Sequence, residues 1–171
     1  MHKLLLILLL SIPLVSCETL DCTQNYVECE VTKVEPNIYE LKIKPLIEAM
    51  ILVESGGNDS AYCKKEEAVG CLQIRPIMLK ECNRVLELQN SNKRYKLHDR
   101  WSREKSIEIF HIINQFHNKE ATHEEIARFW NGGPKWSDKS GTKRYWSKVK
   151  RKLKKLLKEN DKSSTDWVAE V

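Results

Sequence analysis

The chain has 171 residues, of which 41% are hydrophobic and 31% charged, proportions that are typical of a globular protein. This length suits one domain with appendages and is sufficient to bury a hydrophobic core. The net charge of +5 suits anionic surroundings such as a cell wall or lipid headgroups, and is too small to indicate nucleic-acid binding.

Residues 1–17 are expected to form a secretory signal peptide. The basic start His2-Lys3 precedes an unbroken apolar run, Leu4 to Leu10, which is too short to span a bilayer as a stable helix. The last four residues, ending at Cys17, resemble the lipobox of bacterial lipoproteins, in which the cysteine becomes lipidated. We therefore expect an exported protein of the periplasm or cell envelope, anchored to the membrane at Cys17. Ordinary signal-peptidase cleavage near Cys17 is the alternative.

The cysteines allow disulfide bonds but do not choose between them. The six are Cys17, Cys22, Cys29, Cys63, Cys71 and Cys82. If Cys17 is lipidated or removed, five remain and at least one thiol is unpaired. In an exported protein, Cys22 could pair with Cys29, and two of the remaining three could also pair. No Cys-x-x-Cys spacing occurs, so a zinc site is not expected, and neither is any other metal or cofactor.

The first half of the chain predicts a tether followed by two helices. Residues 18–43 show no sustained hydrophobic period and are interpreted as the tether, and the domain is expected over 44–158. Helical spacing predicts a first helix from Lys44 to Ser55, with Pro45 in its first turn and Gly56-Gly57 after its end. A second helix is expected from Pro76 to about Leu88, and its inward residues would be Ile77, Met78, Val85 and Leu86.

The second half predicts three more helices. Ser102 can cap a broadly apolar helix, and Thr122 to Glu125 match a capping box for a short helix from Glu124 to Trp130. An amphipathic helix is expected over Thr142 to Lys158, with a polar tail over 159–171. Its apolar side would carry Trp146, Val149, Leu153, Leu156 and Leu157. Because strand signals are scarce, the predicted fold class is mainly α.

Glu54 is the candidate for chemistry because it ends the first predicted helix. Apolar neighbours and the negative end of the helix dipole both disfavour its ionised form, so its pKa should be raised. A carboxylic acid that is protonated near neutral pH can protonate the leaving oxygen of a glycosidic bond. On periodicity alone, a solvated glutamate at a helix end is the commoner case.

Four short sequence blocks add to this interpretation. Within residues 44 to 155, in order, they are Glu54–Asn58 (ESGGN), Ala68–Pro76 (AVGCLQIRP), Ile126–Pro134 (IARFWNGGP) and Thr142–Val149 (TKRYWSKV). Together they resemble the motifs of lytic transglycosylases of the lysozyme superfamily, and the last two are also similar to invertebrate-type lysozymes. Each block alone is a weak signal, but four in the family's order and spacing form a strong one.

This resemblance implies a lysozyme-like, mainly α single domain with short or minimal β elements beside an active-site cleft. It implies a monomeric enzyme that acts on peptidoglycan and cleaves the β-1,4 bond between MurNAc and GlcNAc. Glu54 matches the family's catalytic acid, Gln73 a glutamine that lines the cleft, and Asn131 an asparagine in the third block. Trp130 stands where the family has a tyrosine. It is expected either to contact substrate or to be a core aromatic.

The reaction type depends on a second carboxylate. Hydrolytic glycosidases use a pair, and Asp59, Glu66 and Glu67 are candidates in the loop after Glu54. In the resembling family one glutamate suffices, because the sugar's own 6-hydroxyl attacks the anomeric carbon and yields a 1,6-anhydro product. Because no second carboxylate is obvious, the sequence favours a lytic transglycosylase over a hydrolytic muramidase. There are two further alternatives. One is a catalytically silent glycan-binding wall protein, and the other is a membrane-active protein that uses its basic last helix.

Overall fold

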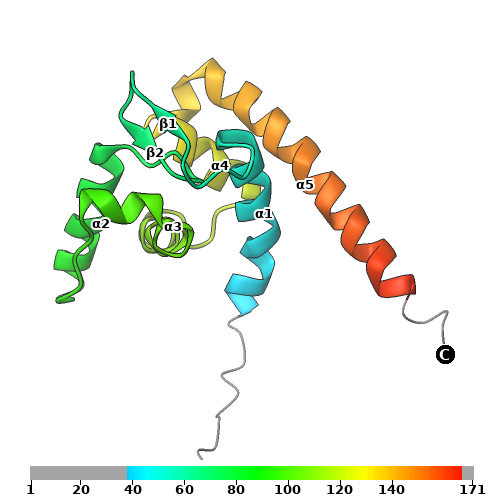
Figure 1. The fold of residues 1–171 in the computed structure, drawn as a ribbon, viewed down its shortest axis with the longest axis horizontal. Helices are drawn as coiled ribbons and strands as arrows, with labels where there is room; N and C mark the ends of the chain where they lie inside the picture. The colour runs from blue at the N-terminus through cyan, green and yellow to red at the C-terminus, as the bar shows by residue number, and fades with distance from the viewer. Residues whose placement is uncertain (1–37, 167–171) are drawn as a thin grey trace, which may run out of the picture. The chain divides into compact units, whose positions relative to one another are not determined.

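The computed structural model describes residues 38–166. The expected signal peptide, Cys17, Cys22, Cys29 and most of the expected tether lie outside the described residues, as do residues 167–171. Within the described range the chain is mainly α, as predicted (Figure 1). In chain order the elements are α1 (Ile38–Glu54), β1 (Tyr62–Cys63), β2 (Ala68–Val69), α2 (Pro76–Leu88), η1 (Leu97–Trp101), α3 (Arg103–His117), α4 (His123–Gly132), η2 (Trp136–Asp138) and α5 (Ser140–Asp166).

Helix α1 begins at Ile38, earlier than the predicted start at Lys44, and Pro45 lies inside it. The apolar face continues upstream of the proline, since Ile43 is buried in the core and Tyr39 packs against it. A proline in a helix interior removes one backbone hydrogen bond, and burial of this face compensates for that loss. The helix ends at Glu54, and Gly56 and Gly57 then adopt left-handed φ values of +66° and +90°.

The predicted boundaries of the middle helices agree well with the structure. Helix α2 runs from Pro76 to Leu88 as predicted. The Ser102 hydroxyl accepts a hydrogen bond from the Lys105 N–H (3.3 Å) and caps α3. The predicted capping box of α4 is also present, because the Glu125 carboxylate accepts from the Thr122 N–H (2.8 Å) while Thr122 accepts from the Glu125 N–H (3.3 Å).

Three expectations were wrong. Ile77 was expected to point inward, but its position in the first turn of α2 leaves it 64% exposed. Leu157 is also exposed, because the core side of α5 is already filled by residues such as Leu153. Residues 159–166, expected in a polar tail, continue α5. No glycine or proline follows Lys158, so nothing in the sequence breaks the helix there.

The core forms where α5 packs along α1 and α4, and where α2 packs on α3 (Figure 1). Its fully buried side chains include Leu46, Met50, Leu72, Ile74 and Phe110. No helix within residues 38–166 combines the length and the apolar character needed to cross a membrane.

The strands β1 and β2 form a small antiparallel hairpin in which Cys63 pairs with Ala68. The disulfide considered among Cys63, Cys71 and Cys82 is not formed, since all three are free thiols. Cys63 is exposed, whereas Cys71 and Cys82 are buried and pack in the core as small hydrophobic residues.

Candidate functional site

A cavity of about 240 Å³ lies where the end of α1 meets the hairpin, the start of α2 and the end of α4. Glu54, Gln73, Trp130 and Asn131 all line it. These are the four residues that the sequence blocks indicated, and Glu54 and Gln73 precede Trp130 and Asn131 by more than 50 residues in the chain. Glu66, Arg75 and Met78 complete most of the remaining wall.

Glu54 is the candidate catalytic residue of this cavity. It is the last residue of α1 and is partly buried. Burial is the largest influence and raises the pKa of its carboxyl from 4.5 to about 7. The nearby Tyr145 hydroxyl and the charge of Arg75 lower the pKa, and the charge of Glu66 raises it. At neutral pH the carboxyl is therefore divided between its acid and base forms.

Tyr145 is the site residue that sequence reasoning missed. It lies on the buried side of α5 and is 8% exposed. Its buried hydroxyl lies near the Glu54 carboxyl and makes no hydrogen bond of ordinary geometry with any described group. Burial and the nearby Glu54 both raise the pKa of Tyr145, so it stays a neutral donor. Its place inside the fourth sequence block was a signal that could have identified it.

The loop between β2 and α2 is held by Arg100 of η1. The Arg100 guanidinium donates to the carbonyls of Glu67, just before β2, and of Ile74, near the end of the loop, each at 2.8 Å, and so ties the loop to the hairpin. Gly70 has a left-handed φ of +79°, and a Cβ atom there would lie 2.1 Å from the Arg100 carbonyl oxygen. Only glycine allows this close approach. The loop is therefore a rigid wall of the cavity.

Gln73 is oriented by that loop. Its φ of +48° is in the left-handed region, which is unusual for a residue other than glycine. Its amide nitrogen donates to the carbonyls of Ala61 (3.2 Å) and Gly70 (3.0 Å). Both partners are acceptors, so they define which end of the amide is the nitrogen. The Gln73 side-chain oxygen is consequently the atom available to accept a hydrogen bond from a ligand.

Trp130 and Asn131 differ in exposure although they are neighbours. Trp130 is 4% exposed, lies 5.0 Å from the Phe110 ring centre, and donates its indole N–H to the Leu72 carbonyl (3.3 Å). It is thus a core aromatic whose surface also forms cavity wall, and its N–H is already engaged. Asn131 is exposed at the cavity rim, where its amide can reach a ligand.

The three candidate second carboxylates are separated by the fold. Asp59 pairs with Arg103 (2.9 Å) and does not line the cavity. Glu67 is exposed, has a φ of +49°, and also lies outside the cavity wall. Glu66 does line the cavity, where it faces Arg75 at 3.6 Å. Glu66 is the one candidate of the three that shares a cavity with Glu54.

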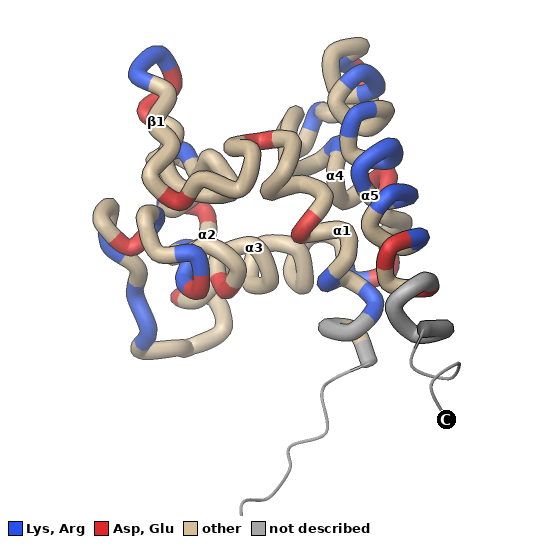
Figure 2. The backbone as a smooth tube through the Cα atoms, turned by 45° about the vertical axis from the view of Figure 1, so that its right-hand side comes forward, with Lys and Arg blue, Asp and Glu red and all other residues tan. Residues whose placement is uncertain are grey.

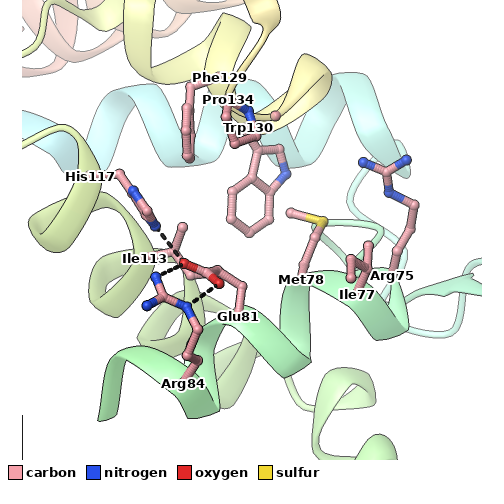
Figure 3. A pocket seen from close by; sticks show the side chains of 11 residues that line it. Arg75, Ile77, Met78, Glu81, Arg84, Ile113, His117, Phe129, Trp130 and Pro134 are labelled. Atoms are coloured by element: carbon pink, nitrogen blue, oxygen red, sulfur yellow. Dashed lines mark hydrogen bonds and ion pairs between the residues drawn. The ribbon is translucent and has the colours of Figure 1, made fainter. Parts of the chain in front are cut away.

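A second, larger cavity of about 470 Å³ adjoins the first and shares Arg75, Met78 and Trp130 with it (Figure 3). Its wall is largely apolar near Phe129 and Pro134. Further along α2, a third cavity of about 530 Å³ shares residues such as Ile77 with the second. Each cavity shares lining residues with the next along α2, and we call this row of adjoining cavities the groove.

A charged cluster sits in the wall of the second cavity. Arg84 donates two hydrogen bonds to the Glu81 carboxylate, at 2.6 and 2.8 Å, and His117 Nε2 lies 2.7 Å from it (Figure 3). Arg84 is the largest influence, and the cluster lowers the pKa of Glu81 to about 2. Glu81 is therefore ionised at all physiological pH values and links α2 to α3.

Comparison with protein-family models, curated proteins and solved structures found no match. The functional assignment therefore rests on the residues and geometry of the cavity. Among residues 38–166, no three His, Cys, Asp or Glu side chains gather into a group that could hold a metal ion.

Proposed function

We propose that this chain is a peptidoglycan lytic transglycosylase with a lysozyme-like fold, which cleaves the β-1,4 bond between MurNAc and GlcNAc. The observation that carries the proposal is a partly buried glutamate, Glu54, with a pKa of about 7 in a cavity shared with Gln73 and Asn131. Export to the cell envelope and lipid anchoring at Cys17 are parts of the same proposal.

In the first step, protonated Glu54 donates its proton to the glycosidic oxygen as the bond to the anomeric carbon breaks. Glu54 is then a carboxylate and accepts the proton of the MurNAc 6-hydroxyl, whose oxygen forms the new bond to the anomeric carbon. The products are a free 4-hydroxyl on GlcNAc and a 1,6-anhydro MurNAc end. A pKa of about 7 suits a group that must act as acid and then as base.

Tyr145 and Gln73 support these steps without transferring a proton. The Tyr145 hydroxyl lies near Glu54 and can donate to the carboxylate formed after the first proton transfer, which would stabilise that carboxylate. The Gln73 side-chain oxygen can accept from a sugar hydroxyl or N-acetyl N–H group. Because the loop fixes this amide in advance, little ordering is required on binding.

The groove along α2 suits an extended polymer. Sugar rings have apolar faces and polar edges, and the wall near Met78, Phe129 and Trp130 offers apolar surface for such faces. A strand whose reacting bond lies at Glu54 could continue into the second cavity. Binding of these remote sugars would position the reacting bond.

The test is product analysis of purified peptidoglycan treated with wild-type protein and with the Glu54→Gln variant. Mass spectrometry should find 1,6-anhydro MurNAc ends with the wild type and a large loss of product with the variant. Full activity in Glu54→Gln would overturn the mechanism. Glycan binding by the wild type without any cleavage would instead support a silent wall-binding protein.

A hydrolytic muramidase is the second candidate, because Glu66 lines the same cavity and its charge raises the pKa of Glu54. In that case Glu66 would serve as nucleophile or base, and products would carry reducing MurNAc ends. Its pairing with Arg75 and its 55% exposed side chain favour a solvated role. Glu66→Gln should therefore retain anhydro products, whereas a collapse of activity together with reducing ends would favour hydrolysis.

A further inference from the structure

The outward side of α5 is densely basic. Between Lys143 and Lys158 the sequence has nine Lys and Arg residues and no Asp or Glu. All nine are exposed. Figure 2 shows this run as successive basic positions along α5. The acidic residues described on this helix, Glu159 and Asp161, come only after the run, where Glu159 pairs with Lys155 at 3.7 Å.

Helical spacing arranges these charges as parallel rows. Residues seven apart lie at nearly the same angle around a helix of 3.6 residues per turn, which places Arg144, Arg151 and Lys158 in one row. Lys148 and Lys155 form a row on one side of it. The central row spans about 21 Å, at 1.5 Å per residue. We call the exposed surface made by these rows and Lys143, Lys150 and Lys154 the basic face.

The opposite side of α5 is already used by the core. Tyr145, Val149 and Leu153 are buried there, and Tyr145 reaches Glu54. No apolar stripe therefore remains for insertion into a lipid layer, and association through the basic face must be electrostatic. The face also lacks aromatic side chains, on which the bases of single-stranded nucleic acid would stack.

We propose that the basic face docks on the surface of an anionic lipid bilayer. Lys and Arg side chains complement lipid phosphates, and each one near an anionic surface strengthens binding about fivefold. The arrangement of the helices supports this partner, because α1 begins and α5 ends at the same end of the domain (Figure 1). The 37 residues before Ile38 include the apolar run Leu4 to Leu10.

Docking through this face uses none of the residues that line the Glu54 cavity. Membrane docking does not require a particular reaction at Glu54, so it can be tested independently of the proposed function.

The test is co-sedimentation of the full chain with vesicles of phosphatidylcholine mixed with phosphatidylglycerol, and with vesicles of phosphatidylcholine alone. The test variant is Arg144→Gln/Arg151→Gln/Lys158→Gln. The matched control is Lys64→Gln/Lys80→Gln/Lys119→Gln, which removes the same charge from exposed lysines on other elements. All three proteins keep the same N-terminal residues, so any binding by that segment cancels in the comparison. Circular dichroism confirms that the helices are retained.

The test variant should bind the mixed vesicles about 100-fold more weakly than wild type, and the control variant within a few-fold of it. Binding by wild type should also fall steeply with added salt. Equal weakening in both variants, or equal wild-type affinity for both kinds of vesicle, would overturn the proposal. Equally tight binding to soluble polyphosphate would likewise overturn it, because a lipid surface would then not be the preferred source of phosphate.

Discussion

Two glutamates in neighbouring cavities of the same groove have opposite electrostatic surroundings. Glu54 is partly buried at the end of α1, and burial raises its pKa to about 7. Glu81 projects from the middle of α2 toward Arg84 and His117, and these partners lower its pKa to about 2. The side chains are chemically identical. Because their surroundings differ, Glu54 can exchange a proton at neutral pH and Glu81 cannot.

This difference in pKa marks Glu54 as a candidate acid and Glu81 as a structural ion. Glu81 has the Arg84 guanidinium and the His117 ring within hydrogen-bond distance, and the permanent charge of Arg84 compensates its own. Glu54 has one neutral hydroxyl and a more distant guanidinium, which only partly offset its burial. A pair of carboxyl groups whose pKa values are pushed apart in this way indicates which one performs acid–base chemistry.

The largest expected effect is on catalysis. Glu54→Gln should lower the rate of peptidoglycan cleavage by about 1,000-fold, since it removes the general acid and base. Glu81→Gln should cost less than about tenfold, through altered binding in the second cavity. Turbidity loss of a cell-wall suspension measures both rates. A similar loss in the two variants would break the distinction between the two glutamates.

The same Glu54→Gln variant should be more stable than wild type at high pH. The pKa of Glu54 is 4.5 in the unfolded chain and about 7 in the fold, so the folded protein binds the proton more tightly. The wild-type free energy of unfolding therefore falls as pH rises from about 4.5 to about 7. Glutamine avoids this loss, which is about 2 kcal/mol for a carboxyl with partial solvation. Urea denaturation at about pH 4 and about pH 8 should show the gain only at the higher pH.

A Tyr145→Phe variant sharpens the comparison through pH dependence. The Tyr145 hydroxyl lowers the pKa of Glu54, so its removal should raise that pKa above 7. The proposed mechanism needs protonated Glu54, so the alkaline limb of the pH–rate profile should move upward by up to about one pH unit. Tyr62→Phe, at an exposed tyrosine outside the cavity wall, is the control and should leave the profile in place. An unshifted profile in Tyr145→Phe would argue against the contact with Glu54.

The smallest expected effect concerns Glu81 and stability. Its pKa is 4.5 when unfolded and about 2 when folded, so its contribution is present above about pH 4.5 and is lost as pH falls toward 2. Because the side chain is 31% exposed, solvent reduces the contribution, and Glu81→Gln should cost about 1 kcal/mol at neutral pH. Urea denaturation should show this cost shrinking in acid. This trend is opposite to the one expected for Glu54, and a parallel trend would contradict the comparison.

Much of the helical framework could be predicted because its signals are local. The Thr122–Glu125 capping box, the Ser102 cap and Pro76 at the start of α2 each depend on residues within one turn of the helix boundary. Where local signals conflict with packing, prediction failed. Pro45 suggested a helix start, but burial of Ile43 extends α1 past it.

By itself, the sequence determined that the chain is mainly helical, that Glu54 ends a helix with a raised pKa, and which blocks accompany it. It could not determine which of Asp59, Glu66 and Glu67 shares the cavity, because that depends on partners such as Arg103, far along the chain. Only the tertiary structure placed Tyr145 beside Glu54 and engaged the Trp130 indole with Leu72. The physical reason is that a helix forms from contacts within a few residues. The pKa, orientation and accessibility of a side chain depend on whichever distant groups the fold brings against it.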